Sequence, residues 1–243
     1  MKKIIFVMLT TYIFITPAFT QTKNYLSIET GISFSGMSNR INNNMKANGF
    51  GDKINYDIYL FFFYLSGSTQ YPRQETSNGN YKIRYGYHIK KNAGIEAGFG
   101  RTYRTVVKGA DGYGYNVNLL NISSEISTAY AAYLWKNKKG NAAVGIGPVV
   151  SICKIKQETP YSSTPLSEKK YLLPGAIFTG YWNFLNKKSW FMGVRSDMTI
   201  TSSAKTATVK VINPDDNNFI SVSKGTGIGG IINTVSLSAG IKF

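Results

Sequence analysis

Residues 234–243, the last ten of the chain, read TVSLSAGIKF. Apolar side chains take every second position of this stretch, and they are Val235, Leu237, Ala239, Ile241 and Phe243. The positions between them hold threonine, serine, glycine and lysine. Because successive side chains of a β-strand point to opposite faces, this period of two predicts a strand with one apolar face and one polar face.

The same alternation recurs along the rest of the chain. Including the last one, eight segments show it: 26–34, 81–89, 95–99, 120–130, 144–153, 172–184, 192–201 and 234–243. Apolar residues do not recur convincingly at helical spacing, and after residue 20 no apolar run approaches the roughly 20 residues of a transmembrane helix. The pattern therefore predicts an all-β chain of eight strands.

The connections between these segments alternate in length. Three are short and basic, at 90–92, 136–141 and 186–189, whereas those at 36–78, 108–116, 157–170 and 203–226 are long. Short turns at one end and long loops at the other are typical of an antiparallel up-and-down transmembrane β-barrel. Single-chain bacterial barrels have even strand numbers, so we interpret residues 54–65 as a hairpin-like part of the long first extracellular loop, 36–78, and not as a ninth strand.

Composition narrows the function classes. The chain has 243 residues, a formal net charge of +16, one histidine and one cysteine. A single cysteine excludes a disulfide framework and a cysteine metal cluster, and no metal-ligand spacing or cofactor motif is present. Residues 1–20 combine two lysines, an apolar run and a small-residue site, which predicts a signal peptide followed by a barrel at 21–243. Export makes nucleic acid a poor partner despite the basic charge.

A soluble β-sandwich is the main alternative to a barrel in lipid. Its polar face would normally carry many Lys, Glu and Asp residues, but here that face is mostly Gly, Ser, Thr and Asn. Small polar residues suit the narrow lumen of a small barrel. On the apolar face, aromatic residues such as Tyr81, Tyr130 and Trp182 suit the two interfacial belts of a membrane protein.

The chain resembles the small eight-stranded outer-membrane β-barrels of the OmpA/OmpX type, without a periplasmic domain after Phe243. The resemblance rests on the eight alternating segments and on the final strand, which is similar to the C-terminal signal read by the outer-membrane insertion machinery. It implies a location in the cell outer membrane of a Gram-negative bacterium. The implied partners are that machinery, outer-membrane lipids and lipopolysaccharide.

Alternation also assigns charged residues to the lumen. The predicted lumen charge network is Glu29, Lys82, Arg84, His88, Glu96, Arg104, Glu125, Arg195 and Asp197. Four acids balance four permanent bases in this set. Because an eight-stranded barrel is only wide enough for side chains to fill it, we expect these groups to pair and close the lumen. A narrow ion pathway or a gate is the alternative use of the same residues.

Three functions follow from this map. The first is a non-enzymatic barrel that acts structurally, or in adhesion and binding through its loops, where the candidate contact aromatics are Tyr56, Tyr59, Phe61, Phe62, Phe63 and Tyr64. The second is a small passive channel, because glycines such as Gly98 and Gly147 on the inner face could leave space. The third is a lipid-modifying enzyme, for which His88 is the only histidine and no catalytic residues can be named.

Overall fold

The computed structural model describes residues 24–50, 53–60, 63–70, 73–75, 79–110, 118–212 and 220–243. The predicted signal peptide lies outside these residues. The elements are β1 (Asn24–Ser35), α2 (Met37–Ala47), β2 (Lys53–Leu60), β3 (Phe63–Gln70), β4 (Arg73–Glu75), β5 (Gly79–Lys90), β6 (Ala93–Ala110), β7 (Asn118–Lys136), β8 (Ala142–Glu158), β9 (Ser167–Asn186), β10 (Trp190–Lys205), β11 (Val209–Ile212), β12 (Ile220–Ser223) and β13 (Gly227–Lys242). No helix among the described residues is long and apolar enough to cross a membrane.

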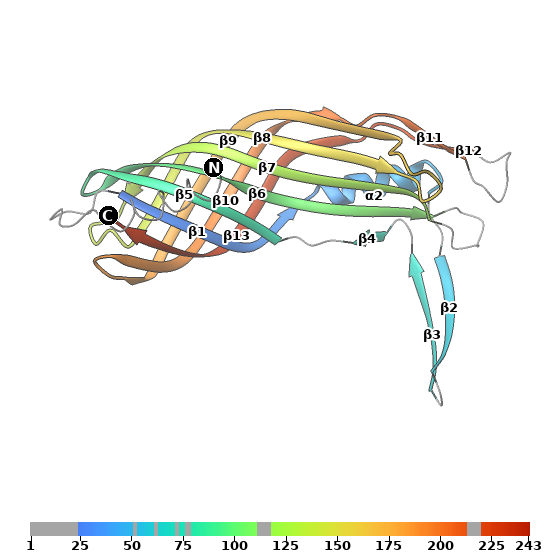
Figure 1. Cartoon of the computed structure of the whole chain (residues 1–243), viewed down its shortest axis with the longest axis horizontal. Coiled ribbons are helices and arrows are strands. Elements are labelled where there is room, and N and C mark those ends of the chain that lie inside the picture. The colour runs from blue at the N-terminus through green and yellow to red at the C-terminus, as the bar shows by residue number, and fades with distance from the viewer. Residues whose placement is uncertain are drawn as a thin grey trace, which may run out of the picture.

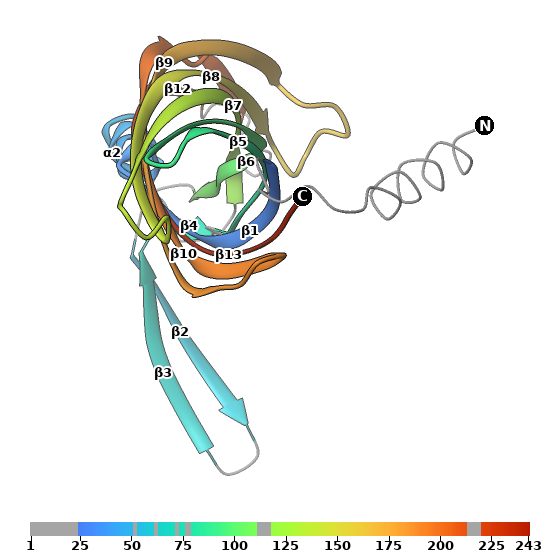
Figure 2. The same ribbon diagram turned by 90° about the vertical axis from the view of Figure 1, so that its left-hand side faces the viewer.

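Eight strands of the described chain form a closed antiparallel ring. Their order is β6, β5, β1, β13, β10, β9, β8 and β7, and the pairing of β7 with β6 completes the circle. The view along the ring shows the closure (Figure 2). The short turns and the C-terminus lie at one end, and α2, β11 and β12 lie at the other (Figure 1). The predicted all-β, eight-stranded up-and-down barrel is confirmed.

The first and last strands join where the chain begins and ends. The backbone N–H of Asn24 donates to the carbonyl of Phe243, and the N–H of Phe243 donates back to Asn24, both at 3.0 Å. Between them β1 and β13 pair continuously from Tyr25 with Lys242 to Ser35 with Ile232. Closure leaves the ring without the unpaired edge that would be unfavourable in lipid.

The half of the ring next to the short turns carries an apolar outer surface, and we call it the membrane half. Val144, Leu172 and Leu237 each expose more than half of their surface there, at 64%, 69% and 63%. Tyr85, Trp135, Trp182 and Trp190 are also exposed on this wall. A continuous apolar outer surface bordered by aromatic rings is typical of the outward-facing band of a barrel that crosses a membrane.

Several strands continue well beyond this apolar band. The strands β6 to β9 have 17 to 20 residues each, whereas about 9–11 tilted residues cross a membrane. We call this second part of the barrel the outer half. Its wall is polar on the outside and apolar on the inside, the reverse of the membrane half. Glu125, Lys154 and Lys156 lie on the outside, and an apolar cluster of Ile122, Ile126 and Ile155 fills the inside. Water surrounds this part of the wall, so its apolar side chains turn inward.

Helix α2 completes the wall of the outer half where β1 and β5 are short. Its buried face, Met37, Ile41 and Met45, is fully covered by the apolar cluster, and the helix packs against β6 and β13. The Arg40 guanidinium donates to the carbonyls of Gly227 (3.2 Å) and Gly229 (2.5 Å) at the start of β13. The helix therefore helps to seal the end of the lumen opposite the short turns with apolar side chains.

Strands β2 and β3, which cover most of residues 54–65, form the hairpin that the sequence analysis predicts in the first long loop. Strands β2 and β3 pair with each other, from Lys53 with Gln70 to Leu60 with Phe63, and belong to a sheet separate from the ring. The hairpin projects away from the barrel at the end that carries α2 (Figures 1 and 2). Tyr59 and Tyr64 are register partners on it. Two of the predicted contact aromatics, Phe61 and Phe62, lie outside the described residues.

Candidate functional site

Six charged side chains meet inside the membrane half of the barrel. Three acids and three bases form this lumen network: Glu29 on β1, Lys82 and Arg84 on β5, Glu96 on β6, and Arg195 and Asp197 on β10. None of the six exposes more than 4% of its surface. Equal numbers of opposite charges allow every ion in this enclosed space to be paired.

Arg84 is the centre of the network. Its guanidinium donates to all three acids, at 2.7 Å to Glu29, 3.1 Å to Glu96 and 2.6 Å to Asp197. It comes from β5, while its acceptors come from β1, β6 and β10. One side chain therefore ties together four of the eight strands across the lumen. Arginine suits this position because its planar fork presents five donors in fixed directions.

The other two bases complete the pairing. Arg195 donates to Glu29 at 3.1 Å and to Glu96 at 2.6 Å, and Lys82 donates to Asp197. Each carboxylate thus has two basic partners. Burying these ion pairs costs desolvation energy, and the further hydrogen bonds of the charged groups offset part of that cost.

Uncharged groups fill the remaining hydrogen-bonding positions. The hydroxyls of Tyr25 and Tyr130 both donate to Glu96, the second at 2.7 Å. Thr179 on β9 donates to the other oxygen of Asp197 at 2.7 Å. Tyr25, Tyr130 and Thr179 extend the network over six strands, β1, β5, β6, β7, β9 and β10, and Thr234 adds β13 as the seventh by donating to Asp197 at 3.3 Å. Tyr25, Tyr130 and Thr179 were missed by the sequence analysis, because two are aromatic and the third is one of many threonines.

Three glycines on the inner face make room for aromatic rings. Gly98 is the register partner of Tyr130, Gly86 of Tyr25 and Gly240 of Phe191. A Cβ placed on each glycine would overlap the ring of its partner. The rings lie across the lumen face of these glycines, so the small residues serve packing. At these three positions the space beside the glycine is occupied by an aromatic side chain.

Replacing Gly98 by valine is expected to lower the free energy of unfolding by about 2–3 kcal/mol, because the Tyr130 ring must move and its bond to Glu96 is lost. Gly180→Val is the matched control, since the nearest atom to a Cβ on Gly180 is 3.6 Å away. Urea unfolding of the refolded proteins, followed by gel mobility, measures the difference. Equal stability of the two variants would contradict the glycine–ring packing.

Two predicted lumen residues lie on the outer wall instead. Arg104 is exposed because β6 carries a bulge between Arg101 and Tyr103, where Thr102 and Tyr103 are both buried. One extra residue in a strand reverses the facing of everything after it. Glu125 also faces outward, opposite Lys154 in the register, because the outer half has its apolar side chains inside. With apolar side chains taken as outward, the pattern of the outer half, extended along β7, predicts Tyr130 on the outer face, whereas its ring lies in the lumen and its hydroxyl bonds to Glu96.

His88 lies at the mouth of the lumen next to the short turns, apart from the six-charge network. Its ring lies 5.6 Å from the ring of Tyr25. The described residues contain no group of three or more His, Cys, Asp and Glu that could hold a metal ion.

Outside the apolar band, Lys154 and Glu168 pair at 2.8 Å, and this hydrogen bond raises the pKa of Lys154 and lowers the pKa of Glu168.

No protein-family model and no curated protein matches the chain. Among solved structures, Ail, the attachment invasion locus protein of Yersinia pestis, has 8% identity and a TM-score of 0.43, with 92% of this chain and 100% of that chain covered. The outer membrane protein OprG from Pseudomonas aeruginosa has 10% identity and a TM-score of 0.48, with 92% and 97% covered. Neisserial surface protein A has 10% identity and a TM-score of 0.39, with 90% and 97% covered.

The closed eight-stranded ring and its apolar outer band decide the architecture. The fold is that of the small eight-stranded outer-membrane barrels. The chain accordingly belongs in the bacterial outer membrane. In such barrels the short turns face the periplasm and the long connections face the outside of the cell. Similarity to solved structures at these levels carries no argument about what the chain does there, so function is argued from the lumen and the two ends.

Proposed function

We propose that the chain is a non-conducting, non-enzymatic barrel that acts through its extracellular end. The observation that carries the proposal is the lumen network, in which Arg84 alone spans the lumen between three acids of three other strands. A solute crossing the barrel would have to separate these pairs in an environment where an unpaired ion is very costly. The passive channel that the inner glycines suggested is disfavoured for this reason.

The enzymatic alternative has little support from the arrangement of the residues. Catalysis on a lipid of the outer leaflet needs a nucleophile and a base close together at the extracellular end. His88 is the only histidine of the chain, and it lines the periplasmic mouth. The carboxylates of Glu29 and Glu96 are held by arginines inside the lumen, so neither is free to act as a base there.

The extracellular end offers a rigid base for exposed loops. The apolar cluster with α2 stabilises the outer half, and the β2–β3 hairpin projects from it (Figure 2). The hairpin sequence is rich in aromatic residues, among them Tyr56, Tyr59 and Tyr64. Aromatic side chains provide large contact areas on apolar and carbohydrate surfaces at low entropic cost. We therefore assign adhesion or surface binding to this hairpin.

Bacteria that carry the barrel are expected to adhere to polystyrene, an apolar surface, or to dextran beads, a carbohydrate surface. Tyr59→Ser together with Tyr64→Ser, which removes one cross-strand pair, should reduce adhesion at least about fivefold. The control variant, Asn55→Ala with Ser68→Ala, changes another register pair of the hairpin and should adhere like the wild type. If the tyrosine variant and the control adhere equally, the hairpin is not the contact surface.

A further inference from the structure

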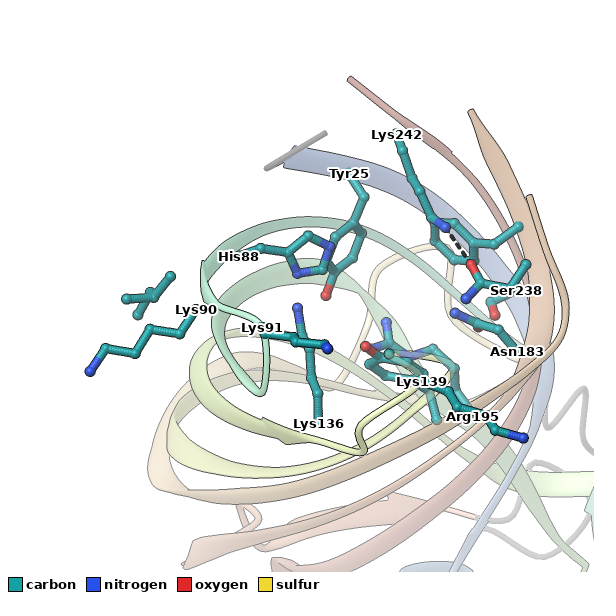
Figure 3. A pocket seen from close by; sticks show the side chains of 15 residues that line it. Tyr25, His88, Lys90, Lys91, Lys136, Lys139, Asn183, Arg195, Ser238 and Lys242 are labelled. Carbon is teal, nitrogen blue, oxygen red and sulfur yellow. Dashed lines mark hydrogen bonds between the residues drawn. The ribbon is translucent and has the colours of Figure 1, made fainter. Parts of the chain in front are cut away.

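The periplasmic mouth of the barrel contains a cavity of about 600 Å³. Its walls come from the three short turns and from the ends of β1 and β13 (Figure 3). Its floor is formed by Arg195, which belongs to the lumen network. The cavity is therefore a blind pocket that opens toward the periplasm, and its size lies in the range of small-molecule sites.

The lining of this pocket carries charge of one sign. Its cations are Lys90, Lys91, Lys136, Lys139, Arg195 and Lys242, and none of the residues that line it is Asp or Glu. Arg195 is already paired with Glu29 and Glu96 beneath the floor. Lys242 donates to Asn186 and, at 2.8 Å, to the carbonyl of Lys187. The lysines nevertheless leave an uncompensated positive potential, which a concave site concentrates.

Lys136 is the distinctive member of this group. It exposes only 8% of its surface, and its ammonium has no hydrogen-bond partner among the described residues. Its Nζ lies 5.9 Å from the centroid of the Tyr25 ring and points into the pocket, whereas Lys90 points away (Figure 3). A buried ammonium without an acceptor is unfavourable, so this position favours an anion.

Two further polar groups in the lining lack partners within the described part of the chain. They are the hydroxyl of Ser238, on a residue 3% exposed, and the side-chain oxygen of Asn183, on a residue 7% exposed. A hydroxyl donates to an anion, while an amide oxygen accepts from a hydroxyl. Tyr25, Tyr181 and Phe191 provide an aromatic wall beside them. These groups fit a ligand with an anionic head and a small hydroxyl-bearing body.

We propose that this pocket binds a phosphate ester of a small polyhydroxy compound, with the phosphate at Lys136. Phosphate suits the site because its several acceptor oxygens can take donors from more than one lysine and from the Ser238 hydroxyl. Glycerol phosphate has this chemistry both as a soluble compound and as the headgroup of phosphatidylglycerol, where its two hydroxyls stay free. Nothing in this inference depends on whether the barrel conducts.

Calorimetric titration of the refolded protein with glycerol 3-phosphate, in an uncharged detergent at low salt, tests the soluble form. We expect a Kd of about 1 mM or tighter and no binding of glycerol. Lys136→Met should weaken binding at least about tenfold through loss of a charge-assisted hydrogen bond. The control is Lys138→Met, an exposed lysine of the same turn that does not line the pocket, which should change the Kd less than about twofold.

A second arm measures how much phosphatidylglycerol, relative to phosphatidylcholine, stays with the protein after purification from mixed nanodiscs. Binding of glycerol 3-phosphate that depends on Lys136, without enrichment of phosphatidylglycerol, identifies a soluble ligand. Enrichment of phosphatidylglycerol, with or without that binding, identifies a lipid headgroup. Heat-shifted gel mobility verifies folding of each variant. Lys91→Ser, in an exposed turn, replaces Lys136→Met if that variant does not refold. Binding in neither arm, or equal weakening by Lys138→Met, would overturn the proposal.

Discussion

Replacing Arg84 by methionine is expected to lower the free energy of unfolding by about 3–5 kcal/mol or more, the cost of breaking a buried ion pair from one side. Arg84 contacts Glu29, Glu96 and Asp197. Without it, three buried carboxylates share the two remaining bases, Lys82 and Arg195. We expect the variant to refold poorly at neutral pH and to unfold at a much lower urea concentration than the wild type.

The matched control is Arg104→Met, because Arg104 is exposed on the outer wall and surface ion pairs contribute about 1 kcal/mol or less. A compensated variant sharpens the test. Arg84→Met combined with Glu29→Gln leaves the pairs Arg195 with Glu96 and Lys82 with Asp197, so part of the lost stability should return. An Arg84→Met protein as stable as the Arg104→Met control would contradict the assigned role of the network.

Replacing Ile41 by aspartate is expected to release helix α2 from the outer half of the barrel. Ile41 is fully buried among Met37, Met45 and other members of the apolar cluster, where an unpaired carboxylate costs about 3–5 kcal/mol. The apolar band and the lumen network lie in the membrane half of the barrel, so the ring itself should still form in this variant. We expect limited proteolysis to cut within residues 37–48 of the variant while heat-shifted mobility is retained.

Asn43→Asp is the control for this variant, because it adds the same charge to the same helix at an exposed position. It should leave α2 as resistant to the protease as in the wild type. If Ile41→Asp is cut no faster than Asn43→Asp, the helix does not depend on the apolar cluster, and the proposed seal of the extracellular end is wrong.

The ring could be predicted because each strand of the membrane half carries its own signal. Alternation in β1, β5 and β10 gave the facing of Glu29, Arg84 and Asp197, and the structure places all three in the lumen. In this half, lipid outside and a polar lumen inside give the two faces different chemistry. Apolar and polar positions can therefore be read as outer and inner positions.

The outer half could not be predicted by the same rule, because water lies outside it and the apolar side chains turn inward. The strand β7 shows the change. Its outward residues are Glu125 in the outer half and Tyr133 and Trp135 in the membrane half. The outer face of this one strand is therefore charged at one end and aromatic at the other. Starting from Tyr133 and Trp135 would have given the correct facing of Glu125. The bulge after Arg101 has no comparable signal in the sequence.

The uncharged parts of the lumen depend on register, which the sequence pattern does not give. Tyr130 lies against Gly98, and Tyr25 against Gly86, because each pair is directly opposite on neighbouring strands. If the paired strands were shifted by two residues, every side chain would still face the same side of the wall, but both tyrosines would be separated from their glycines. The sequence therefore indicated the six charges that pair in the lumen, although it also assigned Arg104 and Glu125 there wrongly. It did not indicate that tyrosines fill the space beside these charges or that Lys136 is buried at the mouth.

Single-channel recording of the refolded wild-type protein in a planar bilayer tests the closed lumen most directly. Heat-shifted gel mobility of the same sample verifies that the barrel is folded. Because Arg84 and its partners occupy the lumen, we expect no steady conductance at any moderate voltage. Steady, reproducible conductance from folded protein would contradict the closed lumen and would make the six charges the lining of an ion pathway.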